Sequence, residues 1–119
     1  MLEFYITNAE NKFIKLDNMM KGCWVNMVNP TDDEIQQVAD RFNIAVDYFK
    51  DALDDDERSR IENEENFLCI IVDFPYITHD EAGFPIYETI PIGILIAEDA
   101  FITVSLKETP ILEDFKNNK

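Results

Sequence analysis

Four aspartates, which lie along a short segment with helical spacing and just after it, are the residues best suited to chemistry. Asp47, Asp51 and Asp54 (or Asp55) recur at i, i+4 and i+7 (or i+8), so on a helix they project from one face. Repulsion between like charges at this spacing costs on the order of a few tenths of a kcal/mol per pair. A Mg²⁺ or Ca²⁺ ion bound through carboxylate oxygens and water would relieve it. If this face has a chemistry, that chemistry is the binding of a hard divalent cation.

A simpler explanation of the aspartate pattern stays open. Lys50 lies three residues after Asp47 and four before Asp54, so its ammonium group would relieve the same repulsion. Without further context, the pattern is more typical of a solvated acidic helix face than of a metal site. An EF-hand loop that starts at Asp54 is excluded because Ser59 stands where that loop requires Gly, although Glu65 stands where it requires Glu.

The other reactive side chains form no catalytic set. His79 falls beside Asp80 and Glu81 in a segment typical of a hairpin tip, where we expect an exposed polar residue. Cys23 and Cys69 form no Cys-x-x-Cys motif, and we expect both to be reduced, inert core residues. No nucleophile with an adjacent base is visible, so the sequence predicts that the protein is not an enzyme.

Charge and composition narrow the possible partners. The chain has 25 acidic and 10 basic residues and a formal net charge of -15, so its field repels nucleic acid and anionic lipid headgroups. We therefore expect neither nucleic acid nor a membrane surface as a partner, whereas divalent cations or a basic protein fit. With 119 residues, 46% of them hydrophobic, the chain is expected to fold as a single domain over residues 1–119. No apolar run approaches the roughly 20 residues that a membrane-spanning helix needs.

Two helical segments are expected to position the aspartates. Thr31 is suited to be an N-cap, and Glu34 three residues later completes a capping box. Apolar residues then recur at helical spacing as far as Phe42. A second helix over about residues 46–53 turns Phe49 inward while the aspartates point outward.

Apolar runs before and after the helices predict strands. These are a hairpin over 2–7 and 13–16, a buried strand over 23–28, and an apolar run over 67–72 covered on both faces. A tip over 79–84 joins the strand over 67–76 to a strand that starts near Ile86, so that the two form a long hairpin. The residues from Ile90 to Ile96 alternate strictly, and a last strand covers 101–106. The predicted fold class is α/β (α+β): a mixed, largely antiparallel β-sheet with at least two helices packed on it.

Seven short stretches resemble, in order and spacing, the cytosolic N-terminal domain of CorA-type magnesium transporters. They are residues 24–26, 30–35, 42–44, 49–53, 58–62, 66–71 and 94–104. Each is degenerate alone, but their succession over roughly eighty residues is much more specific than any single one. The family's Gly-Met-Asn pore signature is absent, because Gly22, Gly83 and Gly93 are followed by Cys, Phe and Ile.

The resemblance implies a cytosolic regulatory domain on the cytoplasmic face of the cell membrane, within a homopentamer. The stalk helix and the transmembrane helices lie outside this chain, so we expect the chain itself to be soluble and to meet the membrane only through that missing C-terminal part. In the family, a divalent cation joins an acid of this domain to a carboxylate on the neighbouring subunit's stalk and holds the channel closed. Asp51 matches that acid, with Asp47, Asp54 and Asp55 beside it.

Two hypotheses follow. In the first, the domain senses intracellular divalent cation and gates magnesium or cobalt transport by the full-length protein. Its regulatory Mg²⁺ is expected to bind weakly to the isolated domain, since the stalk carboxylate is missing and Lys50 stands where many relatives have a second acid. In the second, the chain is a stand-alone soluble acidic adaptor that binds a basic protein.

Overall fold

The computed structural model describes residues 1–7, 9–10, 12–54 and 59–107. In chain order the elements are β1 (Leu2–Thr7), β2 (Phe13–Leu16), β3 (Cys23–Val28), α1 (Asp32–Phe42), α2 (Val46–Ala52), β4 (Arg60–Asn63), β5 (Phe67–His79), β6 (Pro85–Ala97) and β7 (Ala100–Ser105). Both predicted helices and all the predicted strands are present. β4 was not predicted.

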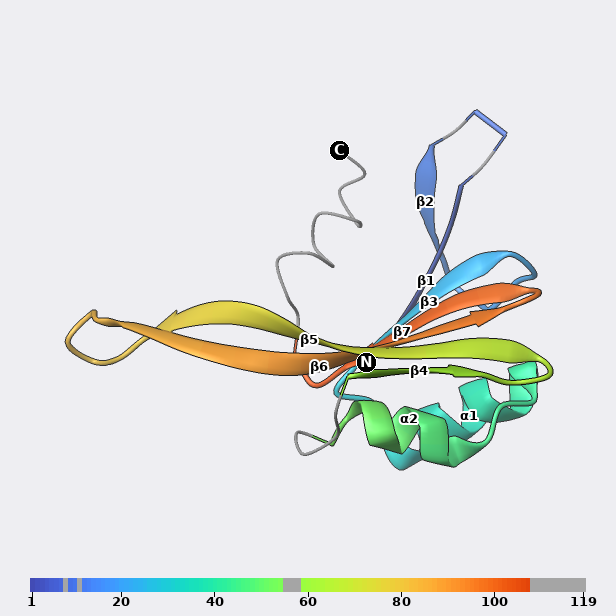
Figure 1. The fold of residues 1–119 in the computed structure, drawn as a ribbon. Coiled ribbons are helices and arrows are strands. Elements are labelled where there is room, and N and C mark those ends of the chain that lie inside the picture. Colours follow the sequence, from blue (N-terminus) through green and yellow to red (C-terminus); the bar gives the residue numbers. More distant parts are fainter. Residues whose placement is uncertain (8, 11, 55–58, 108–119) are drawn as a thin grey trace.

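The strands form one mixed sheet in the order β2-β1-β3-β7-β6-β5-β4. Every neighbouring pair is antiparallel except β3 and β7, which run parallel. Both helices lie against the same face of the sheet (Figure 1). The predicted fold class is therefore confirmed.

The hydrophobic core lies between the helices and that face of the sheet. All six residues of β3 are buried, as predicted, but only Cys23, Val25 and Met27 belong to this core, because alternate residues of a strand point to opposite faces. Val25, Met27 and Ile102 from the sheet belong to the same buried cluster as Val38 of α1 and Phe49 of α2. Burial of these side chains, rather than helix propensity, fixes both short helices on the sheet.

Helix α1 begins as its sequence predicts. The Glu34 backbone N–H donates to Thr31 Oγ1 at 3.1 Å, and the Thr31 N–H donates to Glu34 Oε1 at 2.9 Å, which is a complete capping box. Asn43 ends the helix in the left-handed conformation, with φ of 57°. α1 therefore carries its own start and stop signals.

The predicted long hairpin from residue 67 is present, but the expectation that the apolar run at 67–72 is covered on both faces is wrong. The strand continues to His79, and the helices cover only the side that carries Cys69 and Ile71. Leu68 and Ile70 point to the opposite side and are only partly buried. A continuous apolar run indicates a strand, but it does not reveal how many layers cover that strand.

A two-stranded arm extends from the body of the domain. β5 and β6 pair from Phe67↔Ala97 to His79↔Pro85, and among the described residues no third strand pairs with either of them beyond Ile71 and Ile92. The paired strands run outward as a long twisted ribbon (Figure 1). At its end Asp80 Oδ1 accepts hydrogen bonds from two backbone N–H groups, those of Ala82 and Phe84. This confirms the predicted hairpin tip and the exposed His79.

Within the described ranges, no helix has both the length and the apolar character needed to cross a membrane.

Candidate metal-binding site

Helix α2 holds the predicted aspartates and is positioned by its buried face. Phe49 and Ala52 are 0% and 1% exposed. Ala52 packs against Gly93 of β6, where a Cβ atom on residue 93 would overlap the Cβ of Ala52, so only glycine fits at position 93. The N-cap residue Ala45 offers no side-chain hydrogen bond to the helix. Packing against the sheet therefore sets the position of the acidic face.

The structure brings two of the four predicted aspartates together. Asp47 and Asp51 lie one turn apart on α2 and line the same hollow of about 250 Å³. Asp54 follows the end of the helix, is exposed, and does not line this hollow. Asp55 lies outside the described residues. The predicted stripe is thus a pair on the helix, because α2 ends at Ala52.

β4 supplies two charged residues that sequence reasoning missed. Arg60 Nη2 donates to Asp51 Oδ2 at 2.8 Å, and Arg60 Nε lies 2.8 Å from Glu62 Oε1. Alternation along β4 puts Arg60 and Glu62 on one face, and their partners on β5 are Ile71 and Cys69, beneath the helices. Glu62 also lines the hollow with Asp47 and Asp51. The cation that neutralises Asp51 is therefore Arg60, and not Lys50.

Two side chains near the acidic face of α2, Tyr48 and Cys69, have raised pKa values. The Tyr48 hydroxyl donates to Glu64, which, together with desolvation, raises the pKa of Tyr48 to about 12. Desolvation, followed by the negative charge of Glu62, raises the pKa of Cys69 to about 11. Cys69 is 1% exposed. Its thiol is therefore protonated and inaccessible at neutral pH, which agrees with the predicted inert core cysteine.

The donors on this face suit Mg²⁺ in kind but are too few to enclose it. Carboxylate oxygens are the ligands that this ion prefers, and Mg²⁺ usually keeps several waters and binds through one or two carboxylates. Among the described residues, no three Asp, Glu, His or Cys side chains are arranged to hold a metal ion together. One of the two aspartates is also occupied by a guanidinium. The face therefore offers part of a hard-cation site.

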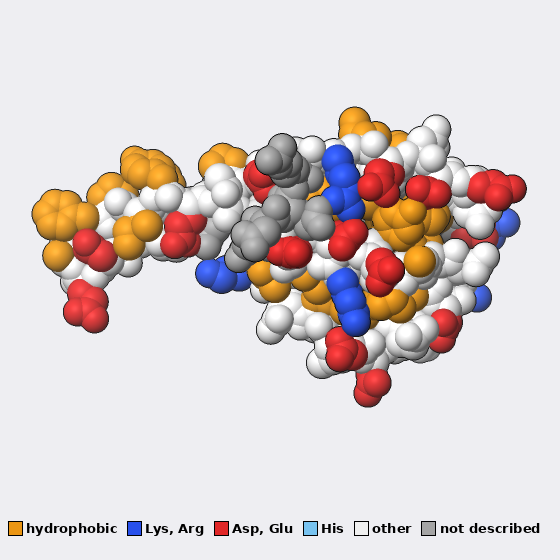
Figure 2. Space-filling view, turned by 60° about the horizontal axis from the view of Figure 1, so that its bottom comes forward, with side chains coloured by type: hydrophobic (Ala, Val, Ile, Leu, Met, Phe, Trp, Pro, Cys, Tyr) orange, Lys and Arg blue, Asp and Glu red, His pale blue; other side chains and the backbone are white. Residues whose placement is uncertain are grey.

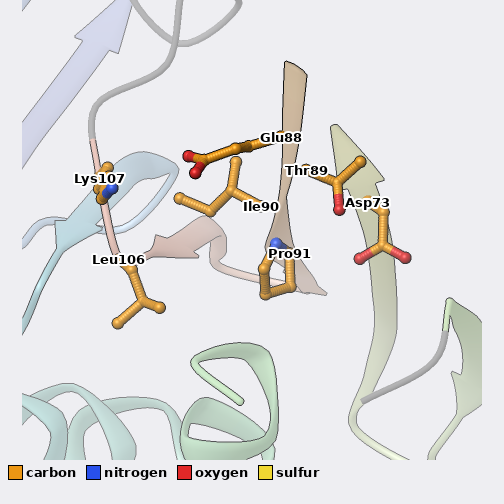
Figure 3. A pocket seen from close by; sticks show the side chains of 7 residues that line it. All are labelled: Asp73, Glu88, Thr89, Ile90, Pro91, Leu106 and Lys107. Carbon is orange, nitrogen blue, oxygen red and sulfur yellow. The ribbon is translucent and has the colours of Figure 1, made fainter. Parts of the chain in front are cut away.

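A larger hollow, of about 490 Å³, lies elsewhere, where the arm leaves the body. It is lined by Asp73, Glu88, Thr89, Ile90, Pro91, Leu106 and Lys107. Glu88 extends to the side where Lys107 lies, whereas Asp73 is on the neighbouring strand (Figure 3). Asp73 Oδ2 also accepts a hydrogen bond from Ser59. The two carboxylates that line this hollow, those of Asp73 and Glu88, point to different sides and do not converge (Figure 3). Size alone therefore does not make this hollow a metal site.

Charge on the helix side of the body is mixed. Acidic side chains alternate there with Lys and Arg over the helices, and no broad basic surface is visible (Figure 2).

Comparisons with known proteins identify the family. The model of the family described as "CorA-like Mg2+ transporter protein" matches residues 20–118. A curated relative, the "Cobalt/magnesium transport protein CorA" of Methanocaldococcus jannaschii, is 27% identical over 81 residues, which is 68% of this chain and 24% of that protein.

Two solved structures from the same organism share the fold. The complete CorA magnesium transporter matches 99% of this chain and 36% of its own chain, with a TM-score of 0.75 and 20% identity. The soluble domain of CorA matches 100% of this chain and 47% of its own, with a TM-score of 0.75 and 21% identity. This chain thus spans about a quarter to a half of the length of these relatives. From its sequence match and its fold, it belongs to the CorA-like Mg²⁺ transporter family.

Proposed function

We propose that this domain senses intracellular divalent cations through the acidic face of α2 and thereby gates Mg²⁺ or Co²⁺ transport by a full-length transporter. One observation carries the proposal: Asp47 and Asp51 share a hollow with Glu62 on an exposed helix face. Membership of the CorA-like family, with the match to residues 20–118, supports the link to transport.

The domain would act at a boundary between subunits on the cytoplasmic face of the membrane. Asp51 and Asp47 supply carboxylate oxygens, and the rest of the shell would come from water and a neighbouring subunit of a homo-oligomer, which we propose to be a pentamer. A bound cation supplies positive charge between acidic surfaces. Without it, repulsion between neighbouring copies of this domain, each of net charge -15, favours their separation, so the open and closed populations shift with cation concentration.

Magnesium titration of the isolated chain tests the proposal. We expect Mg²⁺, added at constant ionic strength, to shift backbone NMR signals of residues 47–54 and 60–62, with weak affinity because the neighbouring subunit is absent. Asp51→Asn should abolish these shifts. The matched control is Asp40→Asn, which removes one exposed carboxylate from α1 and should leave them intact. Saturating Mg²⁺ without any shift on α2 would refute sensing by this face.

A second candidate function, that of an acidic adaptor for a basic protein, draws support from the arm. No Lys or Arg occurs between Arg60 and Lys107, and Ile77, Phe84 and Tyr87 are 57%, 68% and 76% exposed on the arm. Prolines at positions 75, 85 and 91 remove backbone donors from the ribbon, so contact would be made through side chains rather than by strand addition.

The two functions separate in a binding experiment that uses a chelator. An adaptor keeps its basic partner in EDTA and loses it when Ile77 and Tyr87 are both changed to Ser, whereas Asp51→Asn has no effect. If the domain is a sensor, its response to Mg²⁺ is lost in EDTA and in Asp51→Asn, but it is kept when Ile77 and Tyr87 are changed to Ser. Partner binding that requires Mg²⁺ and Asp51 would exclude the adaptor.

A further inference from the structure

Arg60 holds together two elements that carry the proposed site. Its guanidinium donates to Asp51 of α2 at 2.8 Å and lies 2.8 Å from Glu62 of β4. The three side chains are only 26%, 38% and 36% exposed. Hydrogen bonds between ionised groups are shorter and stronger than those between neutral groups, and a partly buried ion pair is screened less by salt than a fully exposed one.

The guanidinium occupies an oxygen that a metal ion would need. Asp51 Oδ2 accepts from Arg60, and Glu62, which lines the same hollow, faces the same guanidinium. A divalent cation that entered the hollow would therefore meet carboxylates already neutralised by a tethered positive charge. Asp47 is the lining carboxylate on the far turn of the helix.

We propose that Arg60 is a built-in competitor for the cation, so that binding at Asp51 is an exchange in which the guanidinium leaves Asp51 and remains near Glu62. This inference rests on the proposed function and adds its regulation. The exchange lowers the affinity of the site, so that it fills only at high cation concentration. It also removes a direct bond between α2 and β4, which among the described strands is an edge strand paired only with β5.

Arg60→Gln measures the competition, with Lys50→Gln as its matched control. Both variants remove one positive charge near Asp51, but Lys50 is exposed and lies beside Asp51 in the sequence, whereas Arg60 donates to it. We expect Arg60→Gln to tighten Mg²⁺ binding roughly fivefold, because the cation no longer displaces an ion pair. Lys50→Gln should change it by less than about twofold, through screened long-range charge alone.

A second readout needs no variant. In the unmodified chain the Arg60 Nη–H signals should shift and broaden as Mg²⁺ is added, in step with the backbone signals of α2, because Nη2 is the nitrogen that contacts Asp51, while the signals of Arg41 stay unchanged. An Arg60 signal that does not move while α2 responds would overturn the exchange.

The outcomes separate the two proposals. Equal effects of Arg60→Gln and Lys50→Gln, with a clear response at Asp51, refute the exchange and leave cation sensing intact. A lack of response in the unmodified chain and in both variants refutes sensing, and with it the exchange. Circular dichroism of each variant, together with Arg60→Lys, which keeps the charge but loses the planar fork, distinguishes lost folding from lost competition.

Discussion

Gly93→Ala tests the contact that sets the height of α2 above the sheet. A Cβ added to Gly93 would lie closer than 3.0 Å to the Cβ of Ala52, a separation that real side chains essentially never show. Ala52 is 1% exposed, and its Cβ is fixed to the helix backbone, so no side-chain rotation relieves the overlap. The helix itself has to move away from β6.

The cost follows from the size of that displacement. Ordinary contacts of this kind begin at 3.4 Å, so α2 must shift by a few tenths of an ångström or more and loosen Phe49, which is 0% exposed. Overpacking of a well-filled core costs about 1–3 kcal/mol. We expect Gly93→Ala to reduce the free energy of unfolding by this amount and to lengthen the Asp51–Arg60 contact.

Urea unfolding, followed by the fluorescence of Trp24, provides the assay in a double-mutant cycle with Ala52→Gly. Ala52→Gly alone should cost about 1 kcal/mol through helix propensity. In the Ala52→Gly background the added methyl group at position 93 has room, so the further cost of Gly93→Ala should fall close to zero. The two substitutions are therefore expected to couple by about 1–3 kcal/mol.

Gly22→Ala is the matched control. Gly22 has φ of +83° and no atom within 4 Å of an added Cβ, so its cost arises from backbone conformation alone and should be equal in both backgrounds. If Gly93→Ala costs the same in the native chain as in the Ala52→Gly variant, the steric argument is refuted.

Two further predictions concern buried polarity and pH. Thr103→Val removes two buried hydrogen bonds, one from Trp24 Nε1 at 2.9 Å and one to Asn26 Oδ1 at 3.0 Å. It should lower the free energy of unfolding in urea by about 2–3 kcal/mol. Thr103→Ser keeps the hydroxyl group and should cost about 1 kcal/mol or less, so similar costs for the two variants would refute a role for the hydrogen bonds. The hydrogen bond from the Thr31 backbone lowers the pKa of Glu34 below its ordinary value of 4.5, so the stabilisation by Glu34 is complete above that pH and is lost as pH falls through the folded-state value. Unfolding followed between about pH 6 and pH 3 should therefore show a steeper loss of stability for the native chain than for Glu34→Gln, and parallel curves would refute this linkage.

Local sequence patterns determined the elements whose signals lie within a few residues. The capping box of Thr31 and Glu34, the apolar stripe of α1 and the turn at the tip of the arm all depend on contacts between near neighbours. The position of Asp47 and Asp51 on the same face of α2 follows from helical spacing in the same way. The resemblance to CorA-type transporters rested on the order of such segments, and the family match over residues 20–118 confirmed it.

Some features of the fold were not readable from such patterns. The alternation from Ile90 to Ile96 indicated a strand without showing which side would face the helices, and the structure places Gly93 and Leu95 there. β4 is four residues long, with charged residues at alternate positions, and carries little hydrophobic signal. Short edge strands of this kind are stabilised by their neighbour rather than by their own sequence.

The sequence by itself determined a capped helix, a carboxylate-lined helix and a set of strands, because each depends on a period of 2 or 3.6 residues. Only the tertiary structure decided that Arg60 pairs with Asp51, since that contact requires β4 to pair with β5 beneath α2. It likewise decided that Thr103 binds Trp24, 79 residues away, through the parallel register of β3 and β7. Contacts of this kind depend on how the elements pack against one another. The free energy of packing is a sum over contacts between residues that lie far apart in the sequence, so no local pattern predicts it.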